Sequence, residues 1–291
     1  MYPACENRGA VSRWIVAALV LVACGGAPPP CPLVAPGAAS NAPLLWRVER
    51  ADGAGVVDRA AQPDAGADDV PPVVWRRLAA APRLISELGS EPPDAAQLSA
   101  LARLPWGQVL DRLLPTDDWW ELVEAMLGAM TEDELRHARP WFALVRLRAH
   151  LARSPRPSMD DALAARAGDA GIAVEALEPW RDQLAALDAS VTPRDLSNAI
   201  HARRAIACEV AQLRVAYRAR DLPALTRMLL DPLRGDPLLV ERNQRWMGQI
   251  ARSFDRGGGF VAVGLGHLLG DRGLPAMFER AGYRVVRDAG W

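Results

Sequence analysis

Two carboxylates and one imidazole are the side chains of this sequence best placed to do chemistry, because each follows a short apolar run. Glu87 ends RLISE, Glu178 ends GIAVEALE, and His267 follows FVAVGLG. In open α/β sheets, ligands bind at the carboxyl ends of the strands. If these runs are neighbouring parallel strands, the three side chains meet at one edge, where they could hold a divalent cation or form a general acid/base pair. The alternative is that each Glu is a solvated strand end and that His267 only caps the next helix.

The residues around His267 predict a β-α-β unit. Phe260–Val263 is an apolar run of strand length that ends at Gly264, and Gly266 lies in the loop that follows. From 274 to 281, apolar residues recur at the spacing of one helix face, and a second strand-like run comes next. His267 therefore lies on the loop after the first strand of the unit.

A polar pair interrupts the apolar stripe of the helix predicted over 241–250. Asn243 falls within this stripe, and Arg242 is its neighbour. A buried amide has to find a hydrogen-bond partner, so we expect both residues to lie within reach of the loop Gly264–His267. There, Arg242 or Asn243 would orient a substrate or stabilise an oxyanion. The alternative is that Asn243 only bridges two parts of the fold.

The rest of the folded region carries both strand and helix signals. Strand patterns occur at Leu44–Val48, 83–87 and 171–178. Helix-start signatures occur at Thr131 with Glu134, Ser158 with Asp161, and Thr192 with Pro193. The last of these helices is predicted to run toward Tyr217. A further helix is predicted at Pro72–Ala80, helical patterns dominate between 94 and 151, and the segment 51–69 shows no period.

The N-terminus has the pattern of a secreted protein. Two arginines precede the apolar run Trp14–Val22, which is too short to span a bilayer but fits a signal-peptide core. The run ends in LVACG, which resembles the lipobox of bacterial lipoproteins. That resemblance implies a signal peptide at 1–23, acylation of Cys24, for example with palmitate, and an extracytoplasmic protein attached to a membrane of the bacterial cell envelope. The alternative is an ordinary secretory signal that happens to contain a cysteine.

Composition limits the remaining possibilities. The 291 residues are 50% apolar and carry a formal net charge of −1, so the chain can bury a core but has no basic surface for nucleic acid. Residues 24–43 are mainly Gly, Ala and Pro and are predicted to be a flexible tether to a single domain at 44–291. In an oxidising envelope, Cys31 and Cys208 could pair or stay apart.

Four stretches of the chain resemble one protein family. They are LLWRVER at 44–50, VEALEPWRDQL at 174–184, ERNQRWM at 241–247 and FVAVGLGHLLGDRGL at 260–274. Together they resemble the TraB/GumN family, which is related to the Tiki metal-dependent proteases and to the erythromycin-esterase/ChaN-like fold. The resemblance covers the chain from Leu44 onward.

The resemblance implies both a fold and a site. The fold is α/β, with two βαβ-type halves that form a mixed sheet and a large helical insert. The site consists of two G-x-x-H motifs and acidic residues, and in the related Tiki proteins such a site binds a divalent transition metal and hydrolyses peptide bonds. In this chain, Gly264 and His267 match the second motif.

The first G-x-x-H motif of the family departs from its pattern here. At its expected place, before VPPVVWRRL, the chain has Arg59-Ala60-Ala61-Gln62, in which Arg replaces Gly and Gln replaces His. A neutral amide is a poorer transition-metal ligand than imidazole. A shifted frame gives Gly55-Val56-Val57-Asp58, in which Asp58 could supply a carboxylate. The segment 53–69 also lacks the apolar strand expected before the motif.

Two kinds of function are therefore compatible with the sequence, and whether the protein is an enzyme stays open. The first is an envelope-anchored, metal-dependent hydrolase acting on a peptide or protein, with one divalent metal (Mn, Co or Zn) bound by His267, Glu87 and Asp58. In that case Glu87, Glu178, Arg242 and Asn243 would be the catalytic residues. The second is a catalytically inactive lipoprotein that binds a peptide, protein or lipid partner or has a structural role. In that case the motif residues Gly264 and Gly266 would only shape a turn.

Overall fold

The computed structural model describes residues 31, 35–37, 40, 42–51, 55–61, 66–88, 95–153, 157–230 and 239–287. Only the backbone is described for 55–61 and Ala95. The chain divides into two units, Met1–Pro32 and Leu33–Trp291, and every helix and strand below belongs to the second. The predicted signal peptide and Cys24 lie outside the described residues.

One mixed sheet forms the centre of the second unit. Its strands in the described residues are β1 (Leu45–Glu49), β2 (Gly55–Ala61), β3 (Arg83–Ser86), β4 (Ala173–Ala176), β5 (Phe260–Gly264) and β6 (Arg284–Arg287). They lie in the order β4-β3-β5-β2-β1-β6. Neighbours among β4, β3, β5 and β2 are parallel, whereas β1 is antiparallel to both of its neighbours. The strands that precede Glu178, Glu87 and His267 are therefore parallel and adjacent, so their carboxyl ends share one edge.

Strand β2 lies in a segment where the sequence predicted none. It pairs with β5 from Val57↔Phe260 to Ala61↔Gly264, and with β1 through Leu45↔Arg59 and its neighbours. The expectation that 53–69 lacks a strand was wrong, because a strand hydrogen-bonded on both sides does not need a strong pattern of its own.

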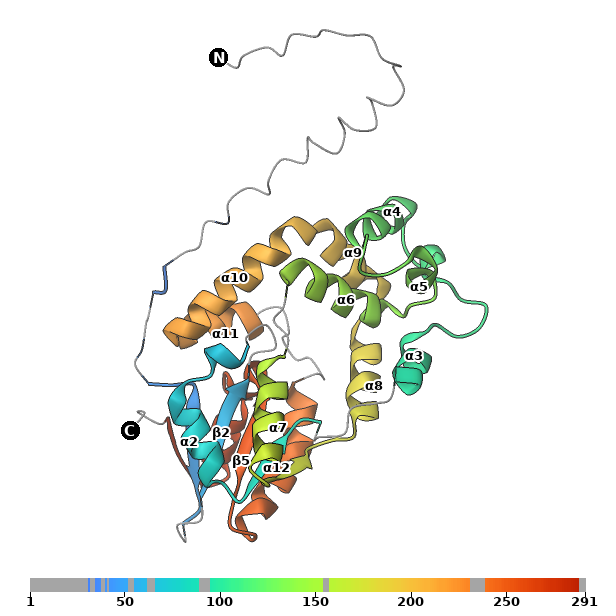
Figure 1. The fold of residues 1–291 in the computed structure, drawn as a ribbon. Helices are drawn as coiled ribbons and strands as arrows, with labels where there is room; N and C mark the ends of the chain where they lie inside the picture. The colour runs from blue at the N-terminus through green and yellow to red at the C-terminus, as the bar shows by residue number, and fades with distance from the viewer. Residues whose placement is uncertain are drawn as a thin grey trace, which may run out of the picture. The chain divides into compact units, whose positions relative to one another are not determined.

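Helices cover both faces of the sheet. The right-handed crossovers between parallel strands place α2 (Pro72–Ala80) and α7 (Met159–Asp169) on one face. They place α12 (Val240–Phe254) and α13 (Leu274–Arg280) on the other. Figure 1 shows α2 and α7 lying over β2 and β5. The four residues Phe260–Val263 of β5 are all buried, which explains why this strand reads as a continuous apolar run.

The helical insert has a hydrophobic core of its own. Between β3 and α7 it contains α3 (Ala95–Ala102), α4 (Thr116–Ala125), α5 (Glu132–Arg136) and α6 (Pro140–Ala152). Between β4 and α12 it contains α8 (Trp180–Ser190), α9 (Pro193–His201), α10 (Arg203–Ala219) and α11 (Leu222–Leu230). Buried side chains of α4, α5, α6 and α9 form this second core, and these helices lie together in Figure 1. The predicted α/β fold with a mixed sheet and a large helical insert is confirmed.

The predicted helix starts are capped as expected, but one predicted helix is divided. The side chains of Thr131, Ser158 and Thr192 each accept a hydrogen bond from the backbone of the third helical residue. The helix predicted from Pro193 toward Tyr217 breaks at Ala202 into α9 and α10. The break lets α9 pack into the core of the insert while the end of α10 packs into the core around the sheet.

The last residues of the predicted tether are attached to the folded unit. The backbone N–H of Gly37 donates to Asp221 (2.8 Å), and that of Ser40 donates to Ala219 O (2.9 Å). Arg287 donates to the carbonyls of Ala42 (2.7 Å) and Pro43 (3.0 Å). Residues 37, 40, 42 and 43 of the predicted tether are therefore hydrogen-bonded to the folded unit.

Two further observations concern attachment and crosslinking. Cys31 and Cys208 are each disulfide-bonded, as an oxidising compartment permits. Within the described ranges, no helix is long and apolar enough to cross a membrane.

The turn before α13 makes a specific stability prediction. A Cβ added to Gly273 would lie 2.6 Å from the carbonyl oxygen of Leu269 and 2.7 Å from the carbonyl carbon of Leu268. We expect Gly273→Ala to lower the free energy of unfolding by roughly 2–3 kcal/mol in urea titrations, because backbone has to move. In the matched control Gly168→Ala on α7, no atom lies within 4 Å of the new methyl group. That change should be neutral or stabilise by up to about 1 kcal/mol, and equal losses in the two variants would contradict the packing argument.

Candidate functional site

The predicted site residues of three strands meet at the carboxyl edge of the sheet. Glu87 directly follows β3, Glu178 follows β4 after one intervening residue, and His267 lies in the 3-10 turn η3 (Leu265–Leu268) after β5. Backbone pairing continues beyond β3 and β4, because the N–H of Glu178 donates to the carbonyl of Glu87 over 3.1 Å. This pairing holds the two carboxylates side by side.

Helix α12 brings a guanidinium between these three side chains. Arg242 donates from Nε to Glu178 Oε1 (2.9 Å), and its Nη2 lies 2.6 Å from the same oxygen. Nη2 also donates to Glu87 Oε2 (2.7 Å), and Nη1 lies 3.2 Å from His267 Nε2. The side chain of Arg242 is only 6% exposed. One buried cation therefore links both carboxylates and the imidazole.

Asn243 fixes the orientation and the tautomer of His267. Its side-chain N–H₂ group donates to the carbonyls of His267 (3.2 Å) and Arg272 (3.0 Å). Its Oδ1 is therefore the acceptor that faces His267 Nδ1 at 2.8 Å, which assigns the ring hydrogen to Nδ1. The lone pair of Nε2 is then directed at Arg242.

The buried imidazole is neutral at physiological pH. Burial lowers the pKa of His267 to about 4; the nearby Glu87 opposes this shift and Arg242 adds to it. A neutral ring accepts a hydrogen bond at Nε2 and donates one at Nδ1, in agreement with its two partners.

Glu87 is ionised and held from several sides. Its Oε1 accepts from the backbone N–H of Gly264 (2.6 Å), and its Oε2 accepts from Gln183 of α8 (3.2 Å) in addition to Arg242. Burial alone would raise the pKa of Glu87, but the charge of Arg242 and the hydrogen bonds from Gly264 and Arg242 lower it below its ordinary value. Its side chain is 19% exposed, against 5% for that of Glu178.

A Cβ on either motif glycine would lie tight against a neighbouring side chain. A Cβ on Gly264 would lie 3.2 Å from Glu87 Oε1, and one on Gly266 would lie 3.2 Å from a methyl group of Leu239. Gly264 therefore admits the carboxylate to its backbone N–H, which is a structural task independent of any reaction.

Trp246, like Gln183 of α8, is a member of the site that sequence reasoning missed. Its ring centroid lies 4.5 Å from that of His267, and the guanidinium of Arg242 lies 4.6 Å from the centroid of the Trp246 ring. Its Nε1 donates to Glu178 Oε2 over 3.3 Å. The spacing could have revealed it, because Trp246 is three residues after Asn243 and four after Arg242 on one helix face.

Other predicted site residues are not brought to this edge by the described structure. Asp58 lies within β2 opposite Val261, three residues before the strand ends at Ala61, so its backbone is roughly 10 Å from the edge. The structure describes neither the side chain of Asp58 nor the residues Gln62 and Cys24.

The arrangement does not fit the predicted divalent metal. Glu87 Oε2, Glu178 Oε1 and His267 Nε2 all lie within 3.2 Å of nitrogen atoms of Arg242. A Mn, Co or Zn ion among them would touch a like charge. The part of the chain that the structure describes contains no group of three His, Cys, Asp or Glu side chains arranged as metal ligands.

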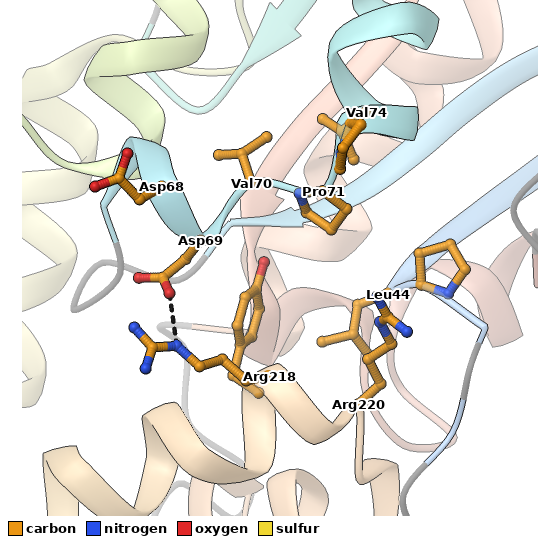
Figure 2. Close-up of a pocket in the computed structure, with 11 residues that line it drawn as sticks. Leu44, Asp68, Asp69, Val70, Pro71, Val74, Arg218 and Arg220 are labelled. Carbon is orange, nitrogen blue, oxygen red and sulfur yellow. Dashed lines mark hydrogen bonds and ion pairs between the residues drawn. The ribbon is translucent and has the colours of Figure 1, made fainter.

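A separate pocket lies away from these residues. It has a volume of about 300 Å³ and is lined by the start of β1, the turn before α2 and the end of α10. In Figure 2, Leu44 and Val70 line it, and Arg218 pairs with Asp69 across 2.7 Å. None of the predicted site residues lines this pocket.

Comparison with known proteins identifies a family. The model of the TraB/PrgY/gumN family matches residues 44–287, which is most of the chain and includes the whole sheet. No curated protein and no solved structure matches.

The buried His267 predicts how stability depends on pH. The pKa of His267 is about 4 in the folded chain, whereas the ordinary value of a histidine, which applies to the unfolded chain, is 6.5. Between pH 4 and pH 6.5 the unfolded chain therefore binds the proton more strongly. The free energy of unfolding should therefore fall as pH falls, by roughly 2 kcal/mol between pH 7 and pH 5. Urea titrations of wild type and His267→Gln measure this, and the variant should lose the slope.

The exposed His150 on α6 supplies the control for this experiment. His150→Gln should keep the slope of the wild type. A slope that persists in His267→Gln would show that other groups cause it.

Proposed function

The chain belongs to the TraB/PrgY/gumN family, and we propose that it is an envelope-anchored, catalytically inactive member that acts as a binding or structural module. The observation that carries this proposal is the position of Arg242 between Glu87, Glu178 and His267. It occupies the acidic and basic groups that a hydrolase would need.

Each requirement of hydrolysis meets an obstacle at this site. A general base needs a lone pair that faces the proton it removes, but His267 directs its lone pair at Arg242. A metal-activated water needs an open coordination position, whereas both carboxylates are bound to the guanidinium. Glu87 has the greatest exposure of the three groups, but it already accepts hydrogen bonds from Gly264, Gln183 and Arg242.

Attachment to the envelope is supported by the sequence pattern at Cys24. A small residue, the cysteine and the preceding apolar run are in register, as in bacterial lipoprotein signals. An extracytoplasmic location also agrees with disulfide-bonded Cys31 and Cys208.

The absence of metal-dependent hydrolysis is directly testable. We expect the full-length protein, purified in detergent without chelator, to contain substoichiometric Mn, Co and Zn by mass spectrometry. It should also cleave no member of a peptide library with or without these metals added. His267→Ala is the control for contaminating peptidases, because any cleavage that survives it does not come from this site. Metal-dependent cleavage that His267→Ala abolishes would refute the proposal and favour the hydrolase.

The lipid anchor makes a separate prediction. Cys24→Ser should leave the precursor uncleaved by the lipoprotein pathway and without label in cells fed a radioactive fatty acid. Cys31→Ser is the matched control and should be processed and labelled as wild type. If Cys24→Ser is cleaved to the mature length and still fractionates with membranes, the protein is not a lipoprotein of this type.

A further inference from the structure

We propose that the outer face of α4 in the helical insert is a docking surface for a basic, amphipathic helix of a partner protein. The inference rests on the proposed function and deepens it, because it names the kind of partner that a catalytically inactive binding module would hold. Helix α4 contributes no residue to the edge that carries Glu87, Glu178 and His267, so the two surfaces can be tested separately.

Helix α4 exposes acidic and apolar side chains in turn along one face. Asp117, Trp120, Glu124 and Leu127 are all exposed, and they follow one another at spacings of three, four and three residues. Such spacings place side chains on the same side of a helix. Leu127 comes just after the helix ends, but its backbone N–H still donates to the carbonyl of Glu124 over 3.3 Å. We call these four residues the α4 seam.

The apolar members of the α4 seam are not needed for packing within the chain. Trp120 is 55% exposed and Leu127 is 69% exposed. The opposite face of α4 supplies the buried side chains of Trp119, Leu122 and Met126 to the core of the insert. In Figure 1, α4 lies at the outer edge of the insert, away from the sheet. A tryptophan held in water on a well-packed helix is typical of a docking surface, where tryptophan is among the commonest anchors.

The charges of the α4 seam favour a basic partner. The other two acidic residues of α4 form ion pairs within the fold, with His201 and Arg203. The carboxylates of Asp117 and Glu124 have no ion-pair partner among the residues that the structure describes, and they lie two helical turns apart on either side of Trp120. A helix that presents Lys or Arg beside an apolar stripe would cover Trp120 and neutralise both carboxylates.

The same charges disfavour two other occupants. The sequence of α4, TDDWWELVEA, has four acidic residues and no Lys or Arg. Packing α4 against α4 of a second copy would therefore bring like charges together. An anionic membrane surface would repel the same carboxylates. A basic amphipathic helix is the occupant that matches both the apolar and the acidic side chains.

The first test measures docking of a synthetic helix. The full-length protein in detergent carries a photo-crosslinking amino acid in place of Leu127 and is titrated with an amphipathic peptide of leucine and lysine. A peptide in which glutamate replaces lysine is the control. The lysine peptide should saturate the adduct at concentrations roughly 10-fold lower than the glutamate peptide. The same amino acid in place of Val286, which is 42% exposed on β6, should give no saturable adduct, which excludes capture through the detergent micelle.

Two substitutions separate the apolar contact from the charge. Trp120→Ser keeps both carboxylates and should weaken binding of the lysine peptide roughly 10-fold or more. Trp106→Ser removes a fully exposed tryptophan outside the α4 seam and should bind as wild type. Asp117→Lys combined with Glu124→Lys should reverse the preference, so that the glutamate peptide binds more tightly. Equal losses in the two tryptophan variants, or a preference that does not reverse, would overturn the inference.

The second test identifies the occupant of the α4 seam in the host cells. The photo-crosslinking amino acid at Leu127 is activated there, and the attached segment is sequenced by mass spectrometry. The inference is supported if this segment carries Lys or Arg beside apolar residues at helical spacing and if Asp117→Lys with Glu124→Lys abolishes the adduct. Adducts only with a second copy of this chain, with lipid or with segments lacking this pattern, or no adduct at all, would overturn it.

Failure of this inference and failure of the proposed function are distinguishable. Loss of docking in a protein that also cleaves no peptide would refute the docking surface alone and leave a structural role. Metal-dependent cleavage that His267→Ala abolishes would refute the proposed function, whatever binds at α4.

Discussion

The buried ion pairs of Arg242 are the interaction on which the centre of this structure depends. Through one guanidinium, α12 is joined to the ends of β3 and β4 and to the turn after β5, although these elements are far apart along the chain. Losing one partner of such a pair costs about 3–5 kcal/mol, because an uncompensated charge stays buried. Satisfying this charge fixes the position of α12 on the sheet, and Trp246 and Asn243 of the same helix then pack against His267.

The same interaction limits the chemistry of the site. Catalytic acids and bases usually face an open cleft, and their environment places their pKa near the pH at which the enzyme works. Here the environment moves both candidates away from that range: burial lowers the pKa of His267 to about 4, and the charge of Arg242 and the backbone N–H of Gly264 lower the pKa of Glu87. His267 is neutral and Glu87 is ionised across the physiological pH range, so neither side chain exchanges protons there. The shifted pKa values of His267 and Glu87 therefore reflect their burial and their contacts with Arg242.

Sequence reasoning located the site but not its internal arrangement. Strand ends are visible as the end of an apolar run, so Glu87, Glu178 and His267 could be assigned to one edge. The hydrophobic period of α12 likewise showed that Asn243 faces inward. The sequence did not reveal β2, whose pairing with β1 and β5 is set by strands distant in sequence, and it left Asp58 in a segment for which no strand was predicted. Nor could it reveal that Arg242 lies between the carboxylates, because a side-chain direction depends on where the whole helix packs.

The residues that carry the family resemblance each have a structural task in this chain, and this changes what the resemblance can imply. Gly264 admits a carboxylate to its backbone N–H, Asn243 satisfies two carbonyls of the turn, and Arg242 neutralises buried charge. All of these contacts are present in the fold and do not depend on a reaction. The presence of these motif residues therefore supports the family assignment and the geometry of the edge. Evidence of catalysis has to come from a group at this edge that is exposed, unsaturated and able to change its protonation, and none of these three provides one.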